Sequence, residues 1–514
     1  MAKQKTVHLT LRAFKENVKL ENCIETGKGK EADNQTGIPN ARIFIFDTPA
    51  KKPHWSDYLK ITNDLESKAC GCIVLFKVGK RPFALTFGYV HHYLNDINLE
   101  YDFPIIVALN CLEKDSLKSV DSTKTEITAQ QRTQVLNTSS LNLFNFDGGT
   151  DILKAITGRV QSQYKELFSL VNAGNSLHIN PKSPIQDIPK LCKKLIELYK
   201  KDDYKTVFPE LGKINLVRDP QLKDELTKKA VDLFFTKSPD IKLGVNGILD
   251  YSKGLRYSYS FPKKENSETY DFLEIEDLYS YLKTKAIKAD LESYEKIKIL
   301  LVGNDDDNKT KSAEFLYRCI LCELKHKGKS YYLDSGRWYE INSDFINLME
   351  SEIDSICVDN ELVPYTLTTT NEGAYNANAS SQLGLLCLDR KDIAPTGETQ
   401  IEPCDILKIN PDRLDMYHIK ISTRSATLSH LFNQGYASIA ALRKNEESKN
   451  KLATLCGKSS LPKDYRVIYG IVTKKSPSLK SKNLPLFSKI TLFRMIDTLR
   501  ERDVLVNLMF IEQS

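Results

Sequence analysis

The chain has 514 residues, and at ~100 to 200 residues per domain this length predicts two to four domains and excludes a single small domain. Hydrophobic residues make up 41% and charged residues 27% of the sequence, as is typical of a folded globular protein rather than a disordered or membrane protein. Lys and Arg number 73 against 67 Asp and Glu, so the net charge of +6 permits a local basic groove but does not require nucleic acid as a partner.

The sequence has no apolar run approaching the ~18 residues that a bilayer-spanning helix needs. Its first residues enter an alternating pattern directly, without the apolar core of a signal peptide. The 11 cysteines are an odd number and favour reduced thiols over a disulfide framework. We therefore expect a cytoplasmic protein without a membrane partner.

Residues 1–170 are predicted to form an α+β domain. Alternating or apolar runs predict strands at 7–14, 41–46, 72–78, 81–87 and 104–110. Gly79-Lys80 joins two of these runs and predicts a hairpin turn. A more helical stretch is expected to begin at 151–156.

Residues 171–310 are predicted to form a mainly helical middle region, because apolar residues such as Leu191, Leu195 and Tyr199 recur there at helical spacing. A polar loop at 304–308 is expected to close it. The run 316–341 then predicts strands, and we assign it to a C-terminal domain that covers 311–514.

The C-terminal domain has the clearest succession of elements. Residues 371–381 can form a helix, and three strands are expected at 383–388, 402–407 and 416–421. A helix follows, for which Ser425 is an available cap, and residues 465–472 form the next strand. One face of that helix is apolar: Leu428, Leu431, Phe432, Ile439 and Leu442.

This order of helix, three strands, helix and strand resembles the core of the PD-(D/E)xK nuclease superfamily. The resemblance implies an α+β or α/β multidomain protein with a restriction-endonuclease-like mixed sheet, flanked by helices, at its C-terminal end. The superfamily places an acid on its second strand and an acid-x-Lys pair on its third. Here Asp405 lies on the second strand, and His418 and Lys420 lie on one face of the third.

The resemblance implies catalytic roles for Asp405, Lys420, His418 and Gln434. Asp405 would supply an oxygen ligand to Mg²⁺ or Mn²⁺, and Lys420 would activate water or stabilise developing negative charge. Gln434 would contact the phosphate or hold Lys420.

His418 departs from the superfamily pattern, because a carboxylate is usual at its position and a hard cation favours oxygen ligands. Glu372 is the first candidate for the missing carboxylate, and Glu402 is the second. The expected metal ligands are thus Asp405, Glu372 and His418. The structural alternative is that Asp405 ends a turn-facing strand and that His418 and Lys420 are an ordinary solvent-facing pair.

Basic residues flank these candidates in the sequence. Arg390, Lys391 and Arg424 are the predicted nucleic-acid contacts, with Lys408 and Arg413 as further members of the same basic surface. Contacts to phosphate dominate nucleic-acid affinity, so this surface is expected to bind nucleic acid, DNA in the first place.

Motifs in both ends of the chain resemble a family of sporadically distributed bacterial proteins of unknown function, the domain of unknown function 6119. The motifs are KPHWS at 52–56, RPFALTFGY at 81–89, DFPIIVALN at 102–110, LKSVD at 117–121, GRWYE at 336–340 and LSHLFNQG at 428–435. The patchy occurrence of such a family implies carriage with mobile or anti-phage genes.

Two functions from different classes follow. The first is a metal-dependent nuclease that acts in bacterial defence against phage or mobile DNA, with a possible protein partner from the same locus. The second is a non-catalytic nucleic-acid-binding or sensor subunit of a defence complex. A toxin that acts on RNA is a third reading, and His418 is the residue that separates the first two.

Overall fold

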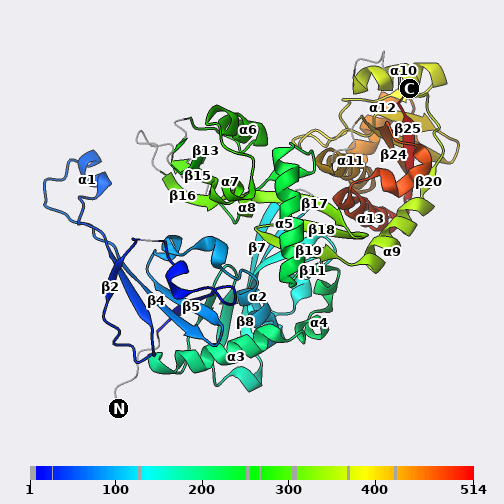
Figure 1. Cartoon of the computed structure of the whole chain (residues 1–514). Helices are drawn as coiled ribbons and strands as arrows, with labels where there is room; N and C mark the ends of the chain where they lie inside the picture. The colour runs from blue at the N-terminus through cyan, green and yellow to red at the C-terminus, as the bar shows by residue number, and fades with distance from the viewer. Residues whose placement is uncertain are drawn as a thin grey trace. The chain divides into compact units, whose positions relative to one another are not determined.

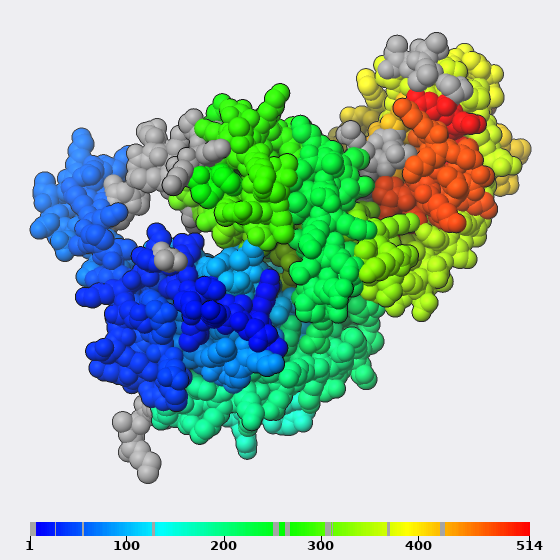
Figure 2. All heavy atoms as spheres, viewed as in Figure 1, coloured from blue at the N-terminus to red at the C-terminus, as the bar shows by residue number. Residues whose placement is uncertain are grey.

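A computed structural model of the chain describes residues 7–25, 27–125, 129–249, 255–262, 264–265, 268–303, 310–366, 371–421 and 425–513. The predicted loop at 304–308 and Arg424 lie outside the described residues. The protein is a mixed α+β structure with several antiparallel pairings (Figure 1). It divides into unit 1, Met1–Thr123 with Gln130–Glu340, and unit 2, Lys124–Ala129 with Ile341–Ser514. Figure 2 shows residues 371–513 of unit 2 in yellow to red.

Unit 1 is built around a sheet of ten described strands, in the order β2-β3-β4-β5-β1-β10-β9-β8-β6-β7. The strands are β1 (Leu9–Ala13), β2 (Lys30–Ala32), β3 (Arg42–Asp47), β4 (Cys70–Val78), β5 (Arg81–Phe87), β6 (Leu112–Lys124), β7 (Ala129–Ser139), β8 (Asp151–Val160), β9 (Leu170–Ala173) and β10 (Leu177–Ile179). The predicted hairpin at Gly79-Lys80 is confirmed, because β4 and β5 pair antiparallel across it. Gly79 adopts a positive φ of 59°, which glycine accepts without steric cost.

The prediction of a strand at 104–110 is wrong, since these residues form helix α2 (Phe103–Cys111). Every residue of α2 is buried, and Pro104 stands in its first turn. A helix that is apolar on all sides carries no periodic signal, so the sequence pattern cannot separate it from a buried strand. Helix α2 packs on α3 (Ile188–Lys200) and on the central strands of the sheet.

The helical reading of 151–156 is also wrong, because these residues begin strand β8. Ile156 pairs with Ala173 of β9, and strand pairing therefore overrides a local pattern that is short and ambiguous.

Two smaller sheets complete unit 1, with orders β11-β19-β18-β17-β12 and β14-β13-β15-β16. Their strands are β11 (Ile214–Leu216), β12 (Ile241–Leu243), β13 (Leu255–Phe261), β14 (Lys264–Glu265), β15 (Lys298–Gly303), β16 (Thr310–Phe315), β17 (Ile320–His326), β18 (Lys329–Asp334) and β19 (Arg337–Ile341). The further helices are α1 (His54–Tyr58), α4 (Tyr204–Val207), α5 (Pro220–Phe235), α6 (Ile275–Thr284), α7 (Leu291–Lys296) and α8 (Leu316–Cys319). Strands therefore alternate with helices in the region predicted to be mainly helical. Strands β17 and β18, which the prediction placed in the C-terminal domain, belong to unit 1.

Unit 2 contains a mixed sheet with the order β20-β25-β24-β23-β22-β21. The strands are β20 (Cys357–Val358), β21 (Leu386–Cys387), β22 (Ile406–Ile409), β23 (Arg413–Lys420), β24 (Asp464–Thr473) and β25 (Leu505–Glu512). The helices are α9 (Ser343–Ser355), α10 (Glu372–Leu383), α11 (Ser425–Lys444), α12 (Glu446–Leu455) and α13 (Leu486–Arg500). β23, β24 and β25 pair parallel, whereas β21, β22 and β23 pair antiparallel. The chain thus runs through α10, three strands, α11 and β24, in the predicted order of elements.

Local sequence explains where the helices of unit 2 begin and how they pack. The Asn371 side chain caps α10 by accepting a hydrogen bond from Ala374 N at 2.9 Å, and Gly384 ends the helix at a φ of 63°. The five apolar residues predicted to share one face of α11 are all fully buried. Gly435 allows α11 to approach β24, because a Cβ atom there would lie 2.5 Å from the Tyr469 hydroxyl oxygen. Among the described helices, none combines the length and apolar character needed to cross a bilayer.

Candidate metal centre

The ends of three neighbouring strands bring acidic residues together in unit 2. Asp389 follows the end of β21, Asp405 precedes the start of β22, and Lys420 ends β23. Because adjacent antiparallel strands run in opposite directions, these three positions lie side by side at the same end of the three strands, which we call the triad edge of the sheet. Two backbone hydrogen bonds fix Asp405 between its neighbours: its carbonyl accepts from Leu388 N at 2.8 Å, and its N–H donates to Tyr417 O at 2.9 Å.

Asp389, Glu402 and Asp405 form a carboxylate triad, since each offers an oxygen within 4.8 Å of the oxygens offered by the other two. Gly373 leaves room for one member, because a Cβ atom at this position would lie 3.0 Å from Asp389 Oδ2. The triad therefore lies beside the first turn of α10. Three carboxylate oxygens at this separation are a donor set of the type that Mg²⁺ or Mn²⁺ prefers.

Burial and electrostatic repulsion raise the pKa values of two members of the triad. Burial raises the pKa of Asp405 to about 7, a hydrogen bond from Ile419 N at 2.6 Å opposes the rise, and nearby Glu372, Asp389 and Glu402 add to it. Burial and Asp389 likewise raise the pKa of Glu402, against the opposing effect of Arg390, Lys420 and His430. A bound divalent cation would remove this repulsion, so the residues fit such an ion.

Lys420 and Glu372 form an ion pair beside the triad. Lys420 Nζ donates to Glu372 Oε1 at 2.7 Å, and Ile421 N donates to Glu372 Oε2 at 3.0 Å. Glu372 is thus held at the end of β23 by two donors. Glu372, Asp405 and Lys420 lie close to one another, as predicted. Glu372 pairs with Lys420, whereas Asp389 and Glu402 form the triad with Asp405.

His418 does not belong to the triad. Its side chain is 2% exposed, its Nε2 has no hydrogen-bond partner, and its ring centroid lies 6.1 Å from that of Tyr469. Burial lowers the pKa of His418 to about 4, which keeps the imidazole neutral at physiological pH. The register that pairs Ile406 with Tyr417 places Asp405 level with His418 on the neighbouring strand.

Helix α11 carries His430, which lies near the triad, and the predicted residue Gln434. His430 is exposed, and its charge affects Glu402. Gln434 stands four residues later, on the same face of the helix, and no hydrogen bond joins its side chain to a described residue. The exposed His430 side chain is therefore available to a ligand beside Glu402.

The predicted basic surface divides into two groups. Arg390 and Lys391 are exposed directly after Asp389, and Arg390 is close enough to affect the ionisation of Glu402. Lys408 instead pairs in register with Asp415, and Arg413 begins β23 at the opposite end from Lys420. At ~3.3 Å per residue, the five residues from Arg413 to His418, which lies level with Asp405, separate Arg413 from the triad by ~17 Å along the strand.

Sequence reasoning did not select Asp389 or His430, and it ranked Glu402 second. A signal for Asp389 does exist: it is an acid directly after the apolar run 385–388, at a strand end next to the strand of Asp405.

A family model described as a family of unknown function (DUF6119) matches residues 7–512. The chain belongs to this family. The match spans both units. No curated protein and no solved structure matches the chain.

Proposed function

We propose that unit 2 is a metal-dependent nuclease of the PD-(D/E)xK type that acts on DNA of phage or mobile elements. The observation that carries the proposal is the carboxylate triad of Asp389, Glu402 and Asp405 with Lys420 at the same edge of the sheet. The order of helix, three strands, helix and strand supports it, since it is the order of a restriction-endonuclease-like core. The link to bacterial defence rests on the sporadic distribution that the family resemblance implies.

The triad would hold Mg²⁺ or Mn²⁺ through carboxylate oxygens. When bound, such an ion polarises a phosphodiester and lowers the pKa of a bound water. Lys420 would place positive charge where negative charge develops on the phosphate oxygens, and Glu372 keeps its ammonium group at this position. Gln434 would donate to the phosphate from α11, while the exposed Arg390 and Lys391 would contact the flanking backbone.

A non-catalytic nucleic-acid-binding subunit is the second candidate, and one observation favours it. His418 occupies the position at which the superfamily carries an acid. Its imidazole is buried, and it supplies no carboxylate to the triad. In this alternative Arg390 and Lys391 still contact the nucleic acid, and the acidic triad does not support hydrolysis.

The decisive experiment measures cleavage of linear, circular and single-stranded DNA and of RNA with Mg²⁺ or Mn²⁺. We expect Asp405→Asn and Lys420→Met to lower the wild-type rate by about 10²- to 10³-fold, because each removes a group that acts on the developing charge. Asp412→Asn is the matched control, since this exposed acid lies in the turn between β22 and β23. It should leave the rate unchanged.

Two results would decide against catalysis at this site. Equal cleavage by wild type and Asp405→Asn would place the chemistry elsewhere. Absence of cleavage by the wild type, together with binding of DNA that weakens steeply between two salt concentrations, would favour the binding subunit.

A further inference from the structure

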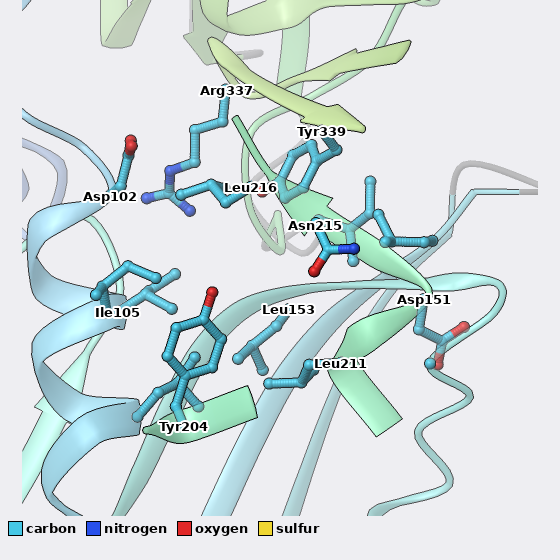
Figure 3. A pocket seen from close by; sticks show the side chains of 15 residues that line it. Asp102, Ile105, Asp151, Leu153, Tyr204, Leu211, Asn215, Leu216, Arg337 and Tyr339 are labelled. Carbon is cyan, nitrogen blue, oxygen red and sulfur yellow. The ribbon is translucent and has the colours of Figure 1, made fainter. Parts of the chain in front are cut away.

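Unit 1 contains a pocket whose walls are mostly apolar and whose polar groups include an arginine without a counter-ion. The pocket lies between α2, β8, α4, β11 and β19, and we call it the Arg337 pocket (Figure 3). Its volume is about 50 Å³, and a neighbouring pocket of about 160 Å³ shares Asp102 and Arg337 with it. The apolar wall is formed by Ile105, Ile106, Leu109, Leu153, Leu211 and Leu216.

Arg337 is 3% exposed, yet its guanidinium is poorly satisfied. Its Nη2 donates to Gly174 O and to Asn175 Oδ1, both at the long distance of 3.3 Å. Its Nε has no partner, and no carboxylate among the described residues forms an ion pair with it. Burying a cation without a counter-ion is costly, and the described residues supply no anion that pairs with this guanidinium, so an anionic ligand would fit here.

The acidic residues that line the pocket are engaged elsewhere. Asp102 Oδ2 accepts from Lys223 Nζ at 2.8 Å. Asp151 accepts from the Thr150 hydroxyl at 2.9 Å and from Asp147 N at 3.1 Å. Neither carboxylate therefore neutralises Arg337 directly.

Two tyrosines add hydroxyl groups to the same space. The Tyr339 hydroxyl is buried beside Arg337 and makes no well-formed hydrogen bond to a described residue. Burial raises the pKa of Tyr339, while the charge of Arg337 and a weak polar contact with its side chain oppose the rise. Figure 3 shows Arg337 reaching into the pocket and the Tyr204 hydroxyl directed toward the same space from the α4 side. A guanidinium fork with adjacent hydroxyl donors matches the oxygens of a carboxylate or phosphate.

A second buried cation lies near Arg337. Lys154 is buried nearby and pairs with Asp334; burial lowers its pKa to about 8, Asp334 opposes this change, and Arg337 and Arg318 add to it. Because Lys154 is paired with Asp334 and does not line the pocket, Arg337 is the cation that an anion in the pocket would meet.

We propose that the Arg337 pocket binds a small organic anion, a carboxylate or a phosphate monoester with a short apolar body. Arg337 holds the oxyanion head, Tyr339 donates a further hydrogen bond, and the leucine and isoleucine side chains surround the body. The site is independent of the nuclease proposal because all its residues belong to unit 1.

The test measures the melting temperature and binding heat of the full chain with butyrate, benzoate and phenyl phosphate, and with benzamide and benzyl alcohol as neutral counterparts. We expect at least one anion to raise the melting temperature while the neutral molecules do not. The response to benzoate against phenyl phosphate identifies the preferred head group. Equal effects of charged and neutral probes, or no shift with any of the three anions, would overturn the proposal.

Three variants make the test specific. Arg337→Met should weaken anion binding at least tenfold, whereas Arg159→Met removes the same charge from an exposed position of β8 and should not change it. Tyr339→Phe should weaken binding while the ligand-free protein melts at or above the wild-type temperature, since it loses only an unpaired buried hydroxyl. Ligand-free Arg337→Met should also melt at or above the wild-type temperature. A clear loss of stability in ligand-free Arg337→Met would instead mean that the guanidinium is already satisfied, and the proposal would fail.

Discussion

Strand β23 has a polar cluster at each end, and the two clusters differ in how their charge is balanced. At its first end, Asp415 is 1% exposed and accepts hydrogen bonds from two arginines and an asparagine. These are Arg466 Nη2 at 2.8 Å, Arg413 Nε at 2.9 Å and Asn410 Nδ2 at 2.8 Å. At its last end, three carboxylates approach one another and the nearest lysine is engaged by Glu372.

The ionisation of the two aspartates reflects this difference. Burial acts to raise the pKa of Asp415, but hydrogen bonds from Arg466, Asn410 and Arg413 outweigh it and leave the pKa below its usual value. At Asp405 the single hydrogen bond from Ile419 N does not offset burial and repulsion, and the pKa rises to about 7. Groups whose pKa is strongly shifted by burial and like charge occur often at functional sites, whereas a carboxylate saturated by arginines is typical of a structural network. The comparison shows a charge-balanced cluster at one end of β23 and an unbalanced acidic cluster at the other, which is the end where we propose that a metal ion binds.

The largest expected effect on stability concerns the saturated end. Arg466→Met should lower the free energy of unfolding by about 3 kcal/mol, because it leaves the buried Asp415 without its bidentate partner. Urea denaturation at pH 7 measures this loss. Arg413→Met removes one hydrogen bond from the same carboxylate and should cost clearly less. Equal losses in the two variants would contradict the leading role of Arg466.

At the acidic end, replacing the aspartate by asparagine is expected to stabilise the fold rather than destabilise it. The pKa of Asp405 is higher in the folded than in the unfolded chain, so the folded chain holds a proton that the unfolded chain has released between about pH 4 and 7. The free energy of unfolding therefore falls as pH rises through this range. Asp405→Asn removes the fall and keeps an oxygen to accept from Ile419 N.

In metal-free buffer at pH 8, Asp405→Asn should be more stable than wild type by about 2 kcal/mol, and the difference should vanish near pH 4. Urea denaturation in the presence of a chelator at both pH values measures it. Asp415→Asn is the matched variant at the other end and should be destabilised at pH 8. Destabilisation of both variants would remove the contrast between the two ends.

The smallest effect concerns His418, which lies between the ends. Its pKa is about 4 in the folded chain, so the unfolded chain binds a proton first as pH falls below ~6.5. Stability that is fully present above that pH is lost as pH falls toward 4. His418→Leu should reduce this acid-induced loss by about 1 to 2 kcal/mol between pH 7 and pH 4.5. An unchanged slope of stability against pH would show that the imidazole is not buried as described.

Much of unit 2 could be predicted from the sequence, because its signals are local. The apolar spacing of α11 and the alternation and turn residues around β22 and β23 specify these elements by side-chain period alone. The positions of Asp405 and Lys420 at the ends of two paired strands follow from that assignment. The sequence also carried enough family-specific motifs in both units to indicate the family that the chain belongs to.

The composition of the acidic triad was decided by the tertiary structure. Asp389 joins Asp405 because β21 pairs with β22, a contact that depends on the path of the chain between residues 387 and 406 rather than on any local pattern. The same holds for His418: strand period placed it on the face of Lys420, but burial against Tyr469 made it a neutral core residue. In unit 1, the sequence shows Arg337 only as a basic residue in a strand. The packing of distant elements buries it, and among the described residues no carboxylate pairs with it. Sequence period fixes which face a side chain occupies, whereas its charge partners come from segments far along the chain and are set only when these segments pack.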